Sequence, residues 1–362
     1  MDFPFPIIDP HIHQWDLLRT PRILSLPRRV LGWNPWLYET VLKLGAKPAD
    51  RDYVGKVDYV AWDYLPPQYS ADAAALPIKQ VVHVEAEWRD HSPLGPVGET
   101  AWLDRLFDNN LDNSADSQNP GPQLGGIVAR ADLRSPRLAE VLSAHHNAST
   151  KLRGIRQMLA SDTDTGIMRF CDRPGLAGDT AWRKGLEQLQ PLGLSFDAWV
   201  FHHQLNELHR LAKAFPQQQF VLDHMGTPIG LGGPFASYGR NAMAREVILK
   251  TWQYGIADLA ECPNVAVKLS GLFMPVVGWG FEKRDQPPSA QELLDAFAPI
   301  CRFVLEHFGV DRCLFASNFP MDKVSLSLES LYALYAATVA DLPREDRRKL
   351  FHDNAQRIYR LG

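Results

Sequence analysis

Asp9-Pro-His-Ile-His13, which directly follows the apolar run Phe3 to Ile8, is the stretch from which the fold of this chain can be predicted. Successive side chains of a strand alternate between its faces, so His11 and His13 project from the same face at the C-terminal end of the strand. Two adjacent imidazoles form half of a metal or anion site, because neutral imidazole is a common metal ligand and titrates near neutral pH. Two surface histidines would give the same pattern, so the rest of the chain decides its meaning.

The composition is that of an ordinary globular protein with a small-molecule partner. The 362 residues are 45% hydrophobic and 22% charged, and 38 Lys and Arg against 42 Asp and Glu give a net charge of -4. Because like charges form no block, we expect neither a nucleic acid nor a membrane as partner, and a homo-oligomer is left open. The four cysteines form no Cys-X-X-Cys pair, and neither an export leader nor an 18-residue apolar run is evident. These features predict a reduced, cytoplasmic protein.

Eight short β-rich runs alternate with amphipathic segments along the chain. Eight strands, each followed by a helix, predict an α/β protein with a (β/α)8 TIM barrel, in one domain over residues 1–362. After the first strand, we expect the others at Lys79–Glu87, Gly125–Ala131, Leu152–Met158, Leu194–Val200, Gln219–His224, Asn264–Ser270 and Arg312–Ser317. The expected helices are Trp102–Phe107, Pro136–His146, Trp182–Leu192, Gln204–Phe215, Ala242–Ala260, Ala290–Phe308 and Leu326–Ala340.

The remaining length lies in insertions that follow strands. Residues 16–76 form a long aromatic-rich insertion directly after the His-X-His strand, so barrel geometry places this insertion at the C-terminal face, where sites are built. We expect it to cover the site, and we expect at least one nearby tryptophan to roof the pocket, because aromatic walls exclude water and stack on planar substrates. The candidates are Trp15, Trp33, Trp36 and Trp62, with Trp15 taken as a substrate-binding residue.

Six motifs in order along the chain resemble the amidohydrolase superfamily, and more narrowly its amidohydrolase-related branch of TIM-barrel hydrolases. That branch includes sugar lactonases and 2-pyrone-4,6-dicarboxylate lactonase. The resemblance runs from Ile8 to Leu361. The motifs are Asp-x-His-x-His, Val-His-Val-Glu-Ala, Leu-Arg-Gly-Ile-Arg, Leu-Asp-His-Met-Gly, Val-Lys-Leu-Ser-Gly and Ser-Asn-Phe-Pro.

The resemblance implies roles for several strand-end residues. It implies that His11 and His13 are metal ligands in metal-dependent members, with zinc as the most common ion, and that His224 is a further ligand or polarises the substrate. It also implies that Arg156 holds a substrate carboxylate, which a guanidinium grips in a bidentate manner. The residues themselves leave alternatives open. Arg156 could form an ion pair with Glu85 or Asp223, and His224 could be a packed, hydrogen-bonded histidine.

Two positions depart from the metal-dependent pattern. Metal-bound members of the superfamily place an aspartate on the eighth strand, where this chain has Asn318, and an amide cannot accept a proton near neutral pH. The fifth strand offers Asp197, with histidines only beyond its end. Because catalytic zinc sites normally use three or more protein ligands, these changes make metal-independent catalysis plausible. Asp322 could replace the missing carboxylate only if the chain bends back.

These residues fit hydrolysis of a lactone or similar ester of a small organic acid or sugar acid. We expect His224, with Asn318, to assist at the carbonyl while Glu85 or Asp197 activates water. Arg156, His203 and Lys268 would contact the substrate, which we expect to be anionic. His203 could instead cap a helix, and Lys268 could pair with a neighbouring carboxylate. The alternatives are a metal-dependent decarboxylase or hydratase acting on an aromatic or unsaturated acid, and an inactive barrel that binds a small acid.

Overall fold

The computed structural model describes residues 3–114 and 121–362, and within them eight strands form one sheet. Every neighbouring pair is parallel, and the order in the sheet is the order in the sequence, β1 to β8. The strands are β1 (Ile7–Ile12), β2 (Ile78–Val84), β3 (Gln123–Arg130), β4 (Leu152–Arg156), β5 (Ser195–Ala198), β6 (Phe220–Leu222), β7 (Val265–Leu269) and β8 (Cys313–Phe315).

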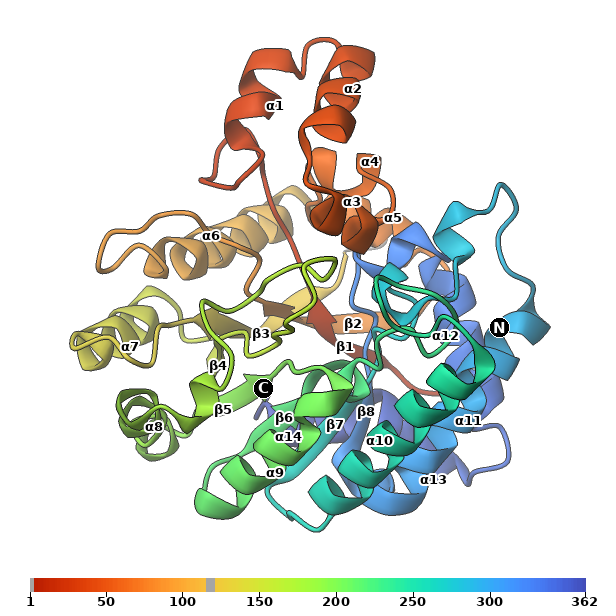
Figure 1. Cartoon of the computed structure of the whole chain (residues 1–362). Coiled ribbons are helices and arrows are strands. Elements are labelled where there is room, and N and C mark those ends of the chain that lie inside the picture. Colours follow the sequence, from red (N-terminus) through yellow and green to blue (C-terminus); the bar gives the residue numbers. More distant parts are fainter. Residues whose placement is uncertain (1–2, 115–120) are drawn as a thin grey trace.

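The sheet closes on itself where the end of β1 meets the segment after β8. The backbone N–H of Asn318 donates to the carbonyl of His11 at 2.9 Å, and the N–H of His13 donates to the carbonyl of Phe319 at 2.8 Å. Figure 1 shows the strands at the centre and helices around them. The predicted (β/α)8 barrel is confirmed.

Amphipathic helices form the outer layer. In α9 the buried residues Leu205, Leu208, Leu211 and Ala212 recur every three to four positions, which is the spacing of one helix face. The helices of this layer are α6 (Val97–Ser114), α7 (Leu138–Ala148), α8 (Thr180–Leu186), α9 (Leu205–Ala214), α10 (Ala242–Ala260), α11 (Ala290–Phe308) and α12 (Leu328–Thr338). None of the described helices has both the length and the apolar composition of a membrane span.

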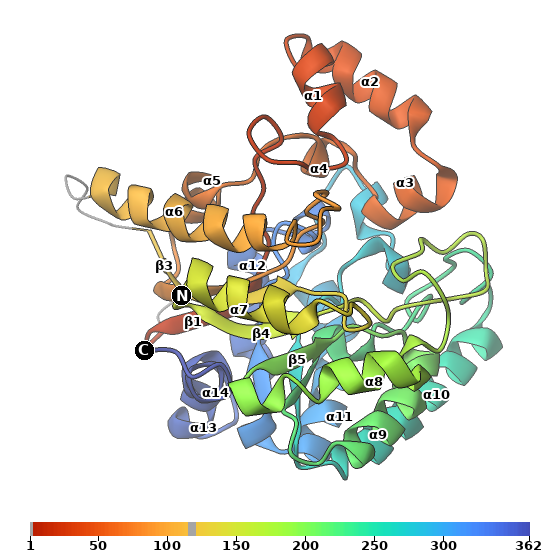
Figure 2. The same cartoon turned by 90° about the vertical axis from the view of Figure 1, so that its left-hand side faces the viewer.

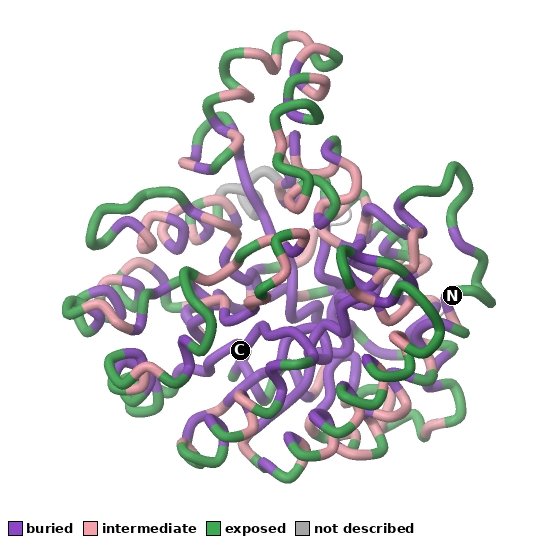
Figure 3. Tube along the Cα trace, viewed as in Figure 1, coloured by how far each residue is buried: buried purple, intermediate pink, exposed green. Residues whose placement is uncertain are grey.

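The C-terminal segment covers the end of the barrel where the strands begin. It contains α13 (Arg344–Arg348) and α14 (Asn354–Ile358), and Ile358 and Tyr359 pack with interior residues such as Val82 and Val221. At the start of β2, Gln80 donates its amide to the carbonyl of Gly362. With this end covered, a substrate must enter at the opposite, C-terminal end of the strands. Figure 3 shows the buried residues gathered along the barrel.

The insertion after β1 is helical. It contains α1 (Ser25–Leu31), α2 (Pro35–Gly45), α3 (Pro48–Val54), α4 (Asp58–Ala61) and α5 (Pro66–Asp72). Three of these helices begin with proline, which is favoured at the first helical position because its missing N–H would have no partner there. Figures 1 and 2 show α1 and α2 standing away from the barrel, with α3 closer to it.

Several predicted strands are too long at their C-terminal ends. β6 ends at Leu222, whereas we predicted a strand to His224, because His224 and Met225 take left-handed backbone angles with φ of 56° and 51°. β8 ends at Phe315, and Asn318 is left-handed as well, with φ of 57°. The chain turns sharply at these points, which aims the following side chains in directions that strand alternation does not predict.

Candidate active site

Three histidines meet at the C-terminal end of the barrel. His11 lies on β1 and His13 directly follows it, and the ring of His224, in the turn after β6, lies with its centre 4.5 Å from that of His11. The Nε2 atoms of His11 and His13 are 3.1 Å apart. The structure therefore brings His224, for which the resemblance implies a role as ligand or polariser, to the pair of His11 and His13.

All three imidazoles are buried and neutral near pH 7. Burial, reinforced by Lys268, holds the pKa of His11 well below its usual value, and burial, reinforced by Arg156, does the same for His13. Burial lowers the pKa of His224 to about 3. A neutral imidazole has one donor and one acceptor nitrogen, so it can donate a hydrogen bond without carrying charge.

The backbone around His224 is shaped to hold its ring in place. Its Nδ1 lies 2.9 Å from the hydroxyl of Ser270, which follows β7. A Cβ added to Gly271 would lie 2.4 Å from Cγ of His224, and Gly271 has a φ of +67°. Only glycine permits this approach, so Ser270 and Gly271 together fix the position of the His224 ring.

Gly271→Ala should displace His224 and lower kcat for the expected lactone hydrolysis roughly tenfold, because small displacements of a group that acts on the substrate slow the reaction. Gly193→Ala is the matched control. Gly193 has a similar φ of +66°, and nothing lies within 4 Å of its added Cβ, so this variant carries only the backbone strain. The measurement is kcat and the melting temperature of both variants. Equal kcat values in the two variants would show that contact with His224 has no effect on the reaction.

Arg156 forms the ion pairs that the sequence left open as an alternative. Its Nε donates to Glu85 Oε1 at 2.9 Å, one terminal nitrogen donates to the Glu85 carbonyl at 2.8 Å, and the other lies 3.5 Å from Asp223. Arg156 and Glu85 are both buried. The guanidinium is thus neutralised by side chains of the protein, and Glu85 is held in place by it.

Lys268 lies at the centre of a buried charged cluster. Its Nζ is 2.7 Å from Asp197, 3.0 Å from Asp223 and 3.1 Å from Nδ1 of His11. Asp197 also accepts hydrogen bonds from Ser195 and from Tyr359. Asp197 thus already accepts hydrogen bonds from three donors of the protein. Lys268 forms ion pairs with carboxylates, which is the alternative that the sequence left open to a contact with the substrate.

Asn318 is hydrogen-bonded to the carboxylate of Asp322, which can accept a proton, as an amide cannot. The chain bends back after β8, and the Asn318 side-chain amide donates to Asp322 Oδ2 at 2.7 Å. The backbone N–H of Phe273 donates to the other oxygen at 2.9 Å. Burial raises the pKa of Asp322 to about 7. A carboxylate with this pKa suits general base catalysis near neutral pH.

Two predicted substrate contacts are directed elsewhere. Trp15 is buried, packs against Tyr64 and donates its indole N–H to the carbonyl of Trp62. His203 is exposed, with Nε2 3.2 Å from the Ser161 carbonyl and its ring stacked on Tyr238. The structure does not bring these side chains into contact with the three histidines, and their binding roles stay predictions.

The insertion reaches the site with a tyrosine that sequence reasoning missed. Trp33 and Trp36 are 77% and 74% exposed, on and beside the projecting helix α2. Tyr53 at the end of α3 is buried, its ring packs 6.1 Å from that of Trp199, and Trp199 in turn packs 6.2 Å from His224. Tyr53 also lies within electrostatic range of Arg156 and Asp322.

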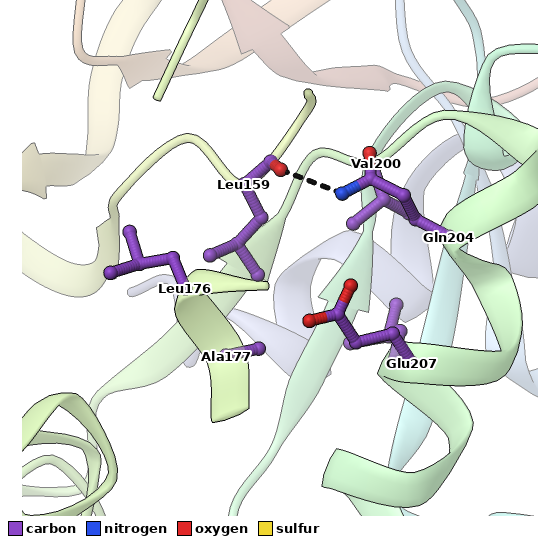
Figure 4. Close-up of a pocket in the computed structure, with 7 residues that line it drawn as sticks. Leu159, Leu176, Ala177, Val200, Gln204 and Glu207 are labelled. Carbon is purple, nitrogen blue, oxygen red and sulfur yellow. Dashed lines mark hydrogen bonds between the residues drawn. The ribbon is translucent and has the colours of Figure 1, made fainter. Parts of the chain in front are cut away.

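A small hollow lies at the start of α9, between the segments that follow β4 and β5. Figure 4 shows Gln204 donating to the carbonyl of Leu159, at 2.9 Å, above a mostly apolar lining. The lining residues are Leu159, Leu176, Ala177, Val200, Gln204, Glu207 and Leu208. With a single ionisable side chain, Glu207, this pocket lacks paired catalytic groups.

One group of possible metal ligands is present among the described residues. It consists of His11, Asp223 and His224, whose ligand atoms lie within 4.8 Å of one another. The Lys268 ammonium contacts two of these three residues, so a cation carried by the protein already lies beside the donor atoms. A divalent ion on these atoms would therefore lie beside a positive charge of the protein.

Comparisons with known proteins identify relatives of this chain and a solved structure with the same fold. The chain is 32% identical over 356 residues to the uncharacterized protein y4mH of Sinorhizobium fredii, with 98% of each chain covered. It is 28% identical over 321 residues to L-fucono-1,5-lactonase of Burkholderia multivorans, covering 87% of this chain and 92% of that one. A crystal structure of an amidohydrolase from Burkholderia multivorans with bound zinc superposes with a TM-score of 0.68 at 23% identity, covering 99% and 100% of the two chains.

The family profile of the amidohydrolases matches residues 8–361, which is nearly the whole chain and includes every strand of the barrel except the first residue of β1. The protein is therefore a member of the amidohydrolase family and a hydrolase of that family.

Proposed function

We propose that the protein hydrolyses an uncharged lactone of a sugar acid. The observation that carries this proposal is the meeting of three neutral imidazoles at the C-terminal end of the barrel, with the Asn318 and Asp322 pair on the turn whose Asn318 N–H donates to the His11 carbonyl. A lactone is an activated ester, so hydrogen bonds to its carbonyl and one general base supply the help that its hydrolysis needs. The similarity to L-fucono-1,5-lactonase supports the same substrate class.

The charges around Arg156 favour an uncharged substrate over the anionic one that the sequence suggested. Arg156 is held by Glu85 and lies near Asp223, while Lys268 contacts Asp197 and Asp223. These three carboxylates outnumber the two cations, so a substrate carboxylate would enter a buried site with excess negative charge. Burying such a charge without a free partner is strongly unfavourable.

The reaction needs one proton acceptor and one polarising donor. The His224 imidazole donates to the lactone carbonyl oxygen, which stabilises the negative charge that develops as water attacks the carbonyl carbon. Asp322 accepts the proton of that water. Each Asp322 oxygen accepts one hydrogen bond in the free protein, so each keeps a lone pair. As the ring C–O bond breaks, the Asp322 carboxyl returns the proton to the leaving ring oxygen.

A panel of lactones tests the substrate class. We expect kcat/KM for an uncharged sugar lactone, such as L-fucono-1,5-lactone, to exceed that for a carboxylated lactone of similar size by roughly tenfold or more, because the latter buries an unpaired charge. The measurement is the initial rate above the spontaneous rate, at constant pH. A preference for the carboxylated lactone would show that Arg156 exchanges Glu85 for substrate. Hydrolysis of no lactone by folded protein would favour an inactive binding barrel.

A further inference from the structure

We propose that the Lys268 side chain is a built-in cation that takes the place of a metal ion in this barrel. Lys268 lies on β7, and its side chain is fully buried. Its Nζ contacts Asp197 from β5, Asp223 after β6 and His11 from β1. The ring of Tyr359, from the C-terminal segment, lies 5.3 Å below it. Lys268 thus connects three strands and the end of the chain.

The acceptors around Lys268 are atoms that metal ions also use. Carboxylate oxygens and imidazole nitrogens are the usual ligands of zinc and other divalent ions. In this barrel the same atoms surround an ammonium, which donates to Asp197 and to His11 and lies 3.0 Å from Asp223. A divalent ion bound to His11 and Asp223 would lie beside a fixed positive charge, which opposes its binding.

The ammonium also fixes the tautomer of His11. An ammonium only donates, so the contact at 3.1 Å makes Nδ1 of His11 an acceptor and leaves the proton on Nε2. That Nε2–H points to Nε2 of His13, at 3.1 Å, and Nδ1–H of His13 donates to the carbonyl of Val84 at 2.8 Å. A histidine that binds a metal through Nε2 needs a lone pair there and usually donates its other N–H to a carboxylate or carbonyl. The Lys268 contact does the opposite for His11. It leaves the proton on Nε2, where a metal would need a lone pair, and it makes Nδ1 an acceptor instead of a donor.

The Asp223 carboxylate faces the ammonium as well. Its Oδ1 lies 3.0 Å from Nζ of Lys268 and 3.4 Å from Nδ1 of His11, so its negative charge is closer to the ammonium than to the imidazole.

This inference concerns the residues of the proposed active site, but its test does not use activity. Wild-type protein titrated with Co2+ should show no ligand-field absorption at one equivalent per chain. Lys268→Met removes the charge at similar length and should bind Co2+ about 10- to 100-fold more tightly. A second change, His11→Phe in the Lys268→Met protein, should abolish the new site. Lys323→Met is the matched control, since Lys323 also contacts a carboxylate, Asp72 at 2.7 Å.

A measurement on the unaltered protein keeps the inference testable if the variants do not fold. Nitrogen-15 chemical shifts of the histidine rings should show His11 protonated at Nε2 and His13 protonated at Nδ1. One Co2+ or Zn2+ bound per wild-type chain through imidazole, or a His11 ring protonated at Nδ1, would overturn the proposal. Either result leaves lactone hydrolysis to be judged by its own assay.

Discussion

Asp322→Asn is expected to lower kcat for lactone hydrolysis roughly 1000-fold, within the range that a general base contributes. The substitution keeps the shape of the side chain and removes its ability to accept a proton. Asn318→Ala should be far milder, about tenfold, because it removes only a neutral hydrogen bond. Asp179→Asn is the control, because Asp179 caps α8 through a hydrogen bond from Trp182 and lies outside the site. A kcat of Asp322→Asn close to that of Asp179→Asn would exclude Asp322 as the base.

The buried Asp322 carboxyl makes both the activity and the stability of the wild-type protein depend on pH. Burial raises the pKa of Asp322 from 3.8 to about 7, so the carboxylate form that accepts the proton is lost as pH falls below about 7. Wild-type kcat/KM should therefore fall below that pH, and Asp322→Asn should lack this limb. Because the folded protein binds the extra proton, Asp322 lowers stability as pH rises between these two values, by about 4 kcal/mol at most. Urea unfolding of both proteins at the ends of this range measures that difference.

His224→Ala is expected to lower kcat roughly 100-fold or more, the typical cost of removing a group that stabilises a developing oxyanion. The loss should appear in kcat more than in KM, since the hydrogen bond strengthens as charge develops on the carbonyl oxygen. His145→Gln is the control for a buried histidine, because the His145 ring contacts Thr100 and the Arg130 carbonyl away from the three histidines. Activity of His224→Ala equal to that of the control would refute a polarising role.

The barrel and the pairing of His11 with His13 could be predicted because both depend on local patterns. Apolar strands that alternate with amphipathic helices predict the fold, and the alternation of side chains along a strand places His11 and His13 on one face. The same alternation was misleading for Asp223. It precedes His224 and would point to the opposite face of a strand, but β6 ends at Leu222 and the turn brings both side chains to the site.

The buried charged cluster around Lys268 and the position of Tyr53 in the insertion could not be predicted, because both depend on contacts between distant segments. Lys268 interrupts the apolar run of β7, and Asp197 interrupts that of β5, which signals that each needs a partner, but their pairing depends on the closed barrel. Tyr53 reaches the site only because α3 folds over it, and nothing local in the sequence distinguishes it from other aromatic residues. Asp322 depends on the left-handed turn at Asn318.

The most direct test of the central claim is the pH profile of kcat/KM for wild-type protein on an uncharged sugar 1,5-lactone, corrected for spontaneous hydrolysis at each pH. The structure predicts saturable hydrolysis whose kcat/KM rises with pH and levels off above about 7, the pKa of Asp322 in the free protein. Folded protein that gives no hydrolysis above the spontaneous rate, or a kcat/KM that does not change across this range, would contradict it.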